Sequence, residues 1–129
     1  MPKRNPLIAI VEDDDSVREA TTGLMRSVGF SVKSFSSAEN FLNASSAYHT
    51  DCLVADVNMP GMSGLDLHRR LVEEGKAIPT ILITAYPDDR VRARAISAGV
   101  LCYLAKPFDG DDLLRCVRSA LDRGTQDES

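Results

Sequence analysis

The chain has 129 residues, of which 43% are hydrophobic and 26% charged, and its formal net charge is −4. This length suits one globular domain, and the net negative charge argues against a general nucleic-acid or membrane-surface binder. No apolar run is long enough to span a bilayer and no signal-type core follows the charged N-terminus, so we expect a cytoplasmic protein without membrane contact.

Apolar strand-like runs alternate along the chain with segments of helical periodicity. We expect strands near residues 7–11, 31–35, 51–55, 79–83 and 101–105, and helices near 15–28, 37–44, 63–74, 88–98 and 110–122. Regular alternation of this kind predicts an α/β fold, a doubly wound parallel sheet with helices on both faces. The expected domain covers residues 6–123, and residues 124–129 are expected to form a disordered tail.

Glycines and cysteines add local expectations. Gly29, Gly75 and Gly124 are expected to end three of the helices, because glycine readily adopts the left-handed conformation that closes a helix. The three cysteines form no Cys-x-x-Cys pair, which favours reduced thiols that are buried in strands (Cys52, Cys102) and a helix (Cys116).

The helix near residues 88–98 has an unusually small apolar face. Its inward positions are expected to be Val91, Ala95 and Ala98, with Ile96 the only large addition. A helix that buries so little apolar area is weakly held. Two interpretations remain open: a short surface helix, or a mobile face that repacks on a signal.

Polar residues stand where four of the apolar strands end: the acids Glu12, Asp13 and Asp56, the hydroxyl of Thr84 and the amine of Lys106. Each alone has an ordinary explanation, since acids cap helices and Asp forms turns. In an open parallel sheet, however, the carboxyl ends of the strands share one edge, where ligands bind. Their joint occurrence therefore predicts a functional site.

Three carboxylates brought together need positive charge beside them. Two like charges 4 Å apart repel by about 4 kcal/mol at an effective dielectric constant near 20. Lys106 supplies one positive charge, and an all-oxygen site suits Mg²⁺ for the remainder, with Mn²⁺ as a possible substitute. The two histidines, His49 and His68, are not spaced for a site, which argues against zinc.

A cation and a lysine beside one carboxylate predict phosphoryl transfer to that carboxylate. Asp56 is then the nucleophile that becomes an aspartyl phosphate, while Lys106 and Thr84 stabilise the phosphoryl oxygens.

The same hypothesis assigns the metal ligands. Asp13 and Asp56 bind the cation directly, Glu12 binds it through water, and the backbone carbonyl of Asn58 completes the shell.

Four motifs carry a family resemblance: Val11-Glu12-Asp13-Asp14, Asp56-Val57-Asn58-Met59-Pro60-Gly61-Met62-Ser63-Gly64, Thr84-Ala85 and Lys106-Pro107-Phe108. Over about residues 6–122 the chain resembles the receiver domains of two-component response regulators. The resemblance implies a flavodoxin-like (βα)5 fold with strand order 2-1-3-4-5 and a cis Lys106–Pro107 bond. It also implies that a sensor histidine kinase supplies the phosphoryl group with Mg²⁺, and that the domain dephosphorylates itself.

The family's conformational switch maps onto Thr84 and Tyr103. Phosphorylation would draw Thr84 toward the phosphoryl group while Tyr103 turns inward, changing a face made by the fourth helix, the fifth strand and the fifth helix. The resemblance also allows a phosphorylation-dependent homodimer through that face. Asn58 and Tyr86 are expected to tune the phosphorylated lifetime, although Tyr86 is equally explained as a loop aromatic that packs on Pro87.

The stretch Ser34–Leu42 is similar to receivers that precede a LuxR-type effector in nitrogen-fixation-type regulators. No effector sequence is present, so the downstream partner is unknown, and the chain is either a stand-alone regulator or the receiver piece of a longer protein.

Three other functions compete with this interpretation. An aspartyl-phosphate phosphohydrolase would need a second acid two residues after its nucleophile, where this chain has Asn58. A binding module that is never phosphorylated would typically have lost a site residue, but all are present. Direct DNA binding through Arg90, Arg92 and Arg94 is disfavoured by the net charge and by the lack of a recognition-helix motif.

Overall fold

The computed structural model describes the backbone of residues 5–44 and 49–128, with side chains up to Asp122. In this part of the chain five parallel strands form one sheet in the order β2-β1-β3-β4-β5, which confirms the doubly wound, flavodoxin-like prediction. The strands are β1 Leu7–Val11, β2 Ser31–Phe35, β3 Cys52–Asp56, β4 Thr80–Thr84 and β5 Cys102–Ala105.

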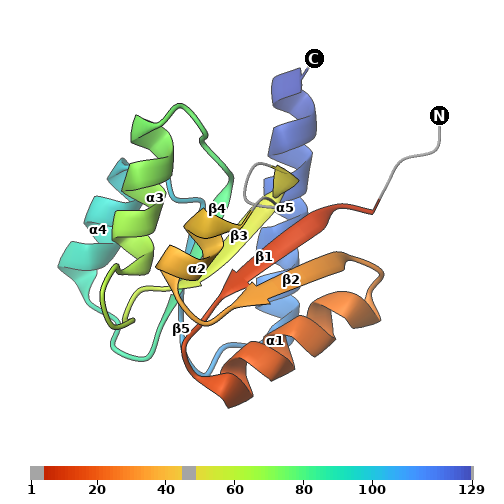
Figure 1. The fold of residues 1–129 in the computed structure, drawn as a ribbon, viewed down its shortest axis with the longest axis horizontal. Coiled ribbons are helices and arrows are strands. Elements are labelled where there is room, and N and C mark those ends of the chain that lie inside the picture. Colours follow the sequence, from red (N-terminus) through yellow and green to blue (C-terminus); the bar gives the residue numbers. More distant parts are fainter. Residues whose placement is uncertain (1–4, 45–48, 129) are drawn as a thin grey trace.

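Helices cover both faces of the sheet. They are α1 Asp15–Ser27, α2 Ala38–Asn43, α3 Gly64–Glu73, α4 Asp89–Ser97 and α5 Gly110–Glu128. Figure 1 shows α1 and α5 on one face and α2, α3 and α4 on the other. Among the described residues, none of the helices combines the length and apolarity needed to cross a bilayer.

Two apolar cores follow from the alternation of side chains along the central strands. Ile8 and Ile10 of β1 belong to the core that includes Met25 of α1 and Leu113 of α5. Ala9 and Val11 of β1 belong to the opposite core, which includes Phe41 of α2. Because β3 and β4 are buried along their whole length, the polar groups that end them are held rigidly.

Helix boundaries follow capping chemistry in most places. Asp14 caps α1 by accepting a hydrogen bond from Val17 N, and Gly29 and Gly75 have the positive φ angles (97° and 73°) expected after α1 and α3. The predicted helix end near Gly124 is wrong, because α5 continues to Glu128 and a glycine inside a helix costs only about 1 kcal/mol. The disorder of residues 124–129 stays a prediction, and Ser129 lies outside the described residues.

The structure confirms the small buried face of helix α4, but the residues on that face differ from those predicted. Ala95 is fully buried and Val91 partly, whereas Ala98 is exposed and Ile96 is 48% exposed. The inward placement of Ile96 and Ala98 is therefore wrong. Val91 and Ala95 are four residues apart and share one face of the helix, whereas Ile96 is rotated by about 100° from Ala95 and lies outside this narrow buried face.

The cysteines are free, as expected, but only Cys52 is buried. Cys102 and Cys116 are partly exposed on β5 and α5, so the expectation of three buried thiols is wrong for these two. Cys102 belongs to β5, which lies at the edge of the sheet and is covered less completely than the central strands.

Candidate functional site

The sheet brings the four strand ends together at one edge. Asp56 and Thr84 are the last residues of β3 and β4, and Glu12 and Lys106 directly follow β1 and β5. The backbone ladder continues into the site, because Lys106 N donates to Thr84 O at 2.7 Å and Glu12 N donates to Phe35 O at 3.0 Å. The site residues are thus positioned by the same hydrogen bonds that hold the sheet.

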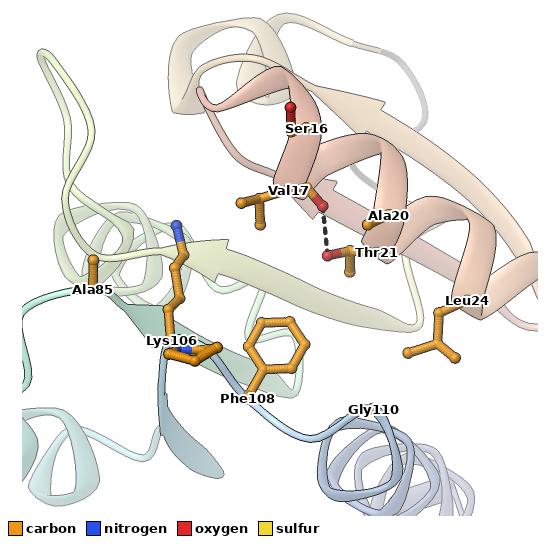
Figure 2. A pocket seen from close by; sticks show the side chains of 10 residues that line it. Ser16, Val17, Ala20, Thr21, Leu24, Ala85, Lys106, Phe108 and Gly110 are labelled. Atoms are coloured by element: carbon orange, nitrogen blue, oxygen red, sulfur yellow. Dashed lines mark hydrogen bonds between the residues drawn. The ribbon is translucent and has the colours of Figure 1, made fainter.

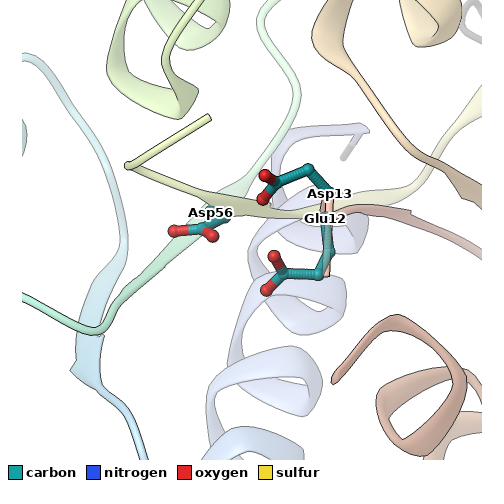
Figure 3. Close-up of side chains that lie close together, drawn as sticks. All are labelled: Glu12, Asp13 and Asp56. Atoms are coloured by element: carbon teal, nitrogen blue, oxygen red, sulfur yellow. The ribbon is translucent and has the colours of Figure 1, made fainter. Parts of the chain in front are cut away.

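Three carboxyl groups, at the end of β3 and just after β1, gather at this edge (Figure 3). One oxygen from each of Glu12, Asp13 and Asp56 lies within 4.8 Å of the others. Glu12 is completely buried and Asp56 is 4% exposed, whereas Asp13 faces solvent. Two of the acids are therefore largely removed from water, where their mutual repulsion is weakly screened.

Lys106 stands between the two buried acids. Its Nζ lies 2.7 Å from Glu12 Oε1 and 3.1 Å from Asp56 Oδ2. Burial alone would lower the pKa of Lys106, but the hydrogen bonds to the two carboxylates outweigh it and leave the pKa raised. The lysine is thus held as a cation against both acids.

Glu12 has the most perturbed carboxyl group of the site. Burial raises its pKa to about 7, Lys106 opposes that rise and the neighbouring Asp56 adds to it. Glu12 Oε2 also accepts a hydrogen bond from Asp14 N at 3.1 Å. A bound cation would favour the ionised form of Glu12.

One contact at the end of β1 was not expected from the sequence. The guanidinium of Arg18 donates to Glu12 O at 2.8 Å and forms an ion pair with Asp15 on its own helix. This ties α1 to the acidic end of β1. No pattern in the sequence distinguishes Arg18 from a solvated helix arginine.

Asp56 and Thr84 are linked through Asn58. The backbone N–H of Asn58 donates to Asp56 Oδ1 at 3.0 Å, and the hydroxyl of Thr84 donates to the side-chain oxygen of Asn58 at 2.5 Å. The N–H of Tyr86 in turn donates to Thr84 Oγ1 at 3.0 Å. The hydroxyl of Thr84 is thus engaged with neighbours on the loops.

The first residue of α3 packs directly beneath the end of β3. A Cβ atom on Gly64 would lie 2.5 Å from Asp56 O and 3.0 Å from Leu82 Cδ2. Only a glycine therefore fits here without displacing the strand end that carries Asp56.

The two tyrosines of the expected switch and lifetime roles differ in exposure. Tyr103 is half-buried, and its hydroxyl accepts a hydrogen bond from Asp88 N at 3.3 Å. Tyr86 is 74% exposed. The Lys106–Pro107 peptide bond is cis, as the resemblance implied.

An apolar groove of about 620 Å³ borders the site between α1 and the segment that follows β5 (Figure 2). Its lining includes Val17 and Leu24 of α1 and, across from them, Phe108. Lys106 contributes to the groove as well as to the acidic cluster. The approach to the acids therefore has an apolar flank.

The donor set fits a hard divalent cation. The clustered ligands are carboxylate oxygens, one of them exposed, and oxygen ligands with room for water suit Mg²⁺. The buried charge of Glu12 and Asp56 is only partly balanced by Lys106, so a cation would relieve the remaining repulsion.

Residues 8–118 match the family model of the response regulator receiver domain. The chain belongs to this family. Receiver domains are the phosphoacceptors of two-component signal transduction, and as a family they take their phosphoryl group from histidine kinases. As a receiver domain, this chain has the phosphoacceptor role. Receiver domains also bind Mg²⁺ at an acidic pocket, and Glu12, Asp13 and Asp56 form such a pocket here.

Similar proteins include full-length response regulators. TmoT of Ectopseudomonas mendocina is 46% identical over 121 residues, which are 94% of this chain and 55% of that protein. TodT of Pseudomonas putida is 43% identical over 129 residues, covering 100% of this chain and 57% of that protein. FixJ of Azorhizobium caulinodans is 36% identical over 126 residues, covering 98% and 59%. This receiver thus spans about half the length of the curated relatives it matches.

Solved structures agree with the receiver assignment. The response regulator StyR superposes with a TM-score of 0.87 at 38% identity, covering 97% of this chain and 63% of that one. The receiver part of FixJ gives a TM-score of 0.82 at 32% identity, with 93% and 96% covered. The likeness to nitrogen-fixation-type regulators is therefore confirmed, and neither a phosphohydrolase nor an unphosphorylated module is favoured.

Proposed function

We propose that Asp56 is the residue that accepts the phosphoryl group. The observation that carries this proposal is the position of its carboxylate: it is nearly buried, 3.1 Å from the ammonium of Lys106 and within 4.8 Å of the other two acids. A carboxylate so placed has its attacking oxygen beside the cationic groups that stabilise the transferring phosphoryl group.

The remaining residues take complementary roles. Asp13 and Asp56 bind Mg²⁺ directly, Glu12 binds it through water, and the carbonyl of Asn58 completes the shell; Mn²⁺ can substitute. The cation, when bound, neutralises charge on the phosphoryl oxygens. Lys106 would do the same with its ammonium group, which lies 3.1 Å from Asp56 Oδ2.

The phosphoryl donor is a phosphohistidine of a sensor histidine kinase. An oxygen of Asp56 attacks phosphorus, the N–P bond breaks, and the histidine nitrogen keeps the electron pair and takes a proton. Attack by water on the acyl phosphate later restores Asp56 and releases inorganic phosphate. The domain thus catalyses only its own phosphorylation and dephosphorylation, with Asn58 and Tyr86 setting the lifetime.

Phosphorylation switches a face for a partner. Thr84 and Tyr103 transmit the change to α4, β5 and α5, which form either a homodimer contact or a contact with an effector. The relatives are about twice as long as this chain, so the effector is part of a longer cytoplasmic regulator or a separate protein.

Intact-mass spectrometry after incubation with acetyl phosphate tests the proposal. Wild type should gain a single phosphoryl adduct only with Mg²⁺, and Asp56→Asn should gain none. Asp122→Asn, which changes an exposed acid on α5, should be labelled like wild type. Labelling of Asp56→Asn, or labelling of folded wild type without any divalent cation, would contradict the assignment.

A further inference from the structure

The hydroxyl of Thr84 is held by two neighbours. It donates its proton to the side-chain oxygen of Asn58 at 2.5 Å and accepts the N–H of Tyr86 at 3.0 Å. Thr84 itself is completely buried, whereas Asn58 lies exposed on the loop after β3. The exposed side chain of Asn58 thus accepts the hydrogen bond that the buried hydroxyl of Thr84 donates.

Asn58 is also connected to Asp56 through its backbone. Its N–H donates to Asp56 Oδ1 at 3.0 Å, so one residue contacts the ends of both β3 and β4. The two contacts are chemically separate, because the backbone N–H serves Asp56 and the side-chain carbonyl serves Thr84. Replacing the side chain therefore removes one contact and leaves the other.

We propose that the side chain of Asn58 is a latch that retains Thr84 in its unphosphorylated position. In this role Asn58 is a positioning residue, since it acts through Thr84 and not on the phosphoryl group. The inference rests on the proposed function, because it assumes that Thr84 moves to a group on Asp56.

The latch follows from the single proton that a threonine hydroxyl can donate. A hydroxyl has a single proton to donate, so Thr84 cannot donate to Asn58 and to a phosphoryl oxygen at once. Asn58 and the phosphoryl group therefore compete for that proton. A contact made only in the unphosphorylated state opposes the switch by its differential free energy between the two states. A typical net hydrogen bond corresponds to a change of about 2- to 10-fold in an equilibrium constant.

The test is the affinity for BeF3⁻ in the presence of Mg²⁺, measured by NMR titration. BeF3⁻ mimics a phosphoryl group on a carboxylate and is not hydrolysed, so its affinity is independent of the phosphorylated lifetime. Asn58→Ala should bind BeF3⁻ about 2- to 10-fold more tightly than wild type.

Two comparisons separate the latch from a general effect of the mutation. Asn40→Ala removes another exposed asparagine that bonds a hydroxyl, that of Ser36 at 3.2 Å, and should leave BeF3⁻ affinity unchanged. In a Thr84→Val background, where the hydroxyl is absent, Asn58→Ala should have no further effect.

A second readout needs no ligand. The methyl couplings of Thr84 report its χ1 angle, and Asn58→Ala should broaden the χ1 distribution in the unphosphorylated protein.

The latch is overturned if Asn58→Ala leaves BeF3⁻ affinity unchanged or weaker, or tightens it equally in the Thr84→Val background. An unchanged χ1 distribution of Thr84 would overturn it as well, whatever binds at Asp56. Failure of wild type to bind BeF3⁻ with Mg²⁺ would instead contradict the proposed function, so the two failures are distinguishable.

Discussion

The hydroxyl of Tyr103 accepts a hydrogen bond of 3.3 Å from the backbone N–H of Asp88. Asp88 is the N-cap of α4, and its carboxylate accepts the N–H groups of Arg90 and Val91. The aromatic residue of β5 is therefore joined to the first turn of a helix that buries little apolar surface. An inward turn of Tyr103 would break this contact and remove one of the hydrogen bonds that hold the N-terminus of α4.

Replacing Tyr103 with phenylalanine should loosen the start of α4 without unfolding the domain. Because one long, half-buried hydrogen bond is lost, the free energy of unfolding should fall by no more than about 1 kcal/mol. Hydrogen exchange at the Asp88 amide should accelerate several-fold. Tyr86→Phe, at a 74% exposed position, is the control and should change neither quantity. Unaltered Asp88 exchange in Tyr103→Phe would show that this contact does not hold α4.

Replacing Lys106 with alanine should tighten Mg²⁺ binding and slow phosphorylation. The ammonium of Lys106 lies against Glu12 and Asp56, so its removal leaves more negative charge for the cation. We expect several-fold tighter Mg²⁺ binding by calorimetry at pH 8, and at least about tenfold slower labelling by acetyl phosphate. Lys33→Ala, on the exposed edge of β2, should match wild type. Weaker Mg²⁺ binding in Lys106→Ala would contradict this electrostatic account.

Two glycine-to-alanine substitutions should have opposite signs. A Cβ at Gly64 would lie 2.5 Å from Asp56 O, so Gly64→Ala should destabilise the domain by about 1–3 kcal/mol and perturb labelling of Asp56. A Cβ at Gly23 in α1 would meet no neighbouring side chain or strand within 4 Å, so Gly23→Ala should stabilise by about 0.5–1 kcal/mol. Urea unfolding measures both changes, and equal effects would refute the packing argument.

Stability should depend on pH through His68. Its side chain is 4% exposed and burial lowers its pKa, while Nδ1 has no hydrogen-bond partner among the described residues. As the pH falls through about 6.5, His68 therefore becomes protonated in the unfolded chain, whereas in the folded chain it stays neutral to a lower pH. The resulting stability is complete above about pH 6.5 and is lost as the pH falls, by at most about 1.4 kcal/mol per pH unit.

Urea unfolding of His68→Leu between pH 5.5 and 7.5 measures this contribution. Glu12 acts in the opposite direction, because its raised pKa makes the folded state bind the extra proton between about pH 4.5 and 7. The difference in the free energy of unfolding between His68→Leu and wild type isolates the contribution of His68. As the pH falls, wild type should lose stability relative to His68→Leu. His49→Leu, at an exposed position, should retain the wild-type slope. A His68→Leu slope equal to that of wild type would rule out this role.

The helices, the strands and their parallel arrangement were predictable from local pattern, whereas the strand order came from the family resemblance. Strand and helix periodicities need only neighbouring residues, and the expected strands differ from the observed ones by a single residue at β3, β4 and β5. Because of that shift, Asp56 and Thr84 end their strands instead of following them. The shift is set by hydrogen bonds between strands, such as Val57 N to Ile83 O, which periodicity does not encode.

Side-chain environments were less predictable. Ile96 and Ala98 were expected to face inward, and both are exposed. This outcome depends on how closely α4 packs against the sheet. The apolar stripe of a helix indicates which face is buried on average. The burial of a residue at the margin of that stripe depends on the neighbouring elements.

The order of acids, hydroxyl and amine at the strand ends was enough to indicate phosphoryl transfer with Mg²⁺. The receiver assignment came from the family resemblance that the four motifs carry. Parallel strands bring their carboxyl ends to one edge, whatever the details of packing. The hydrogen-bond partners of the individual side chains could not be predicted in this way. Thr84 donates to Asn58 and Tyr103 accepts from Asp88 because loops after β3 and β4 approach across the edge of the sheet. Such contacts require sub-ångström placement of segments far apart in the chain, which arises only when the two cores pack.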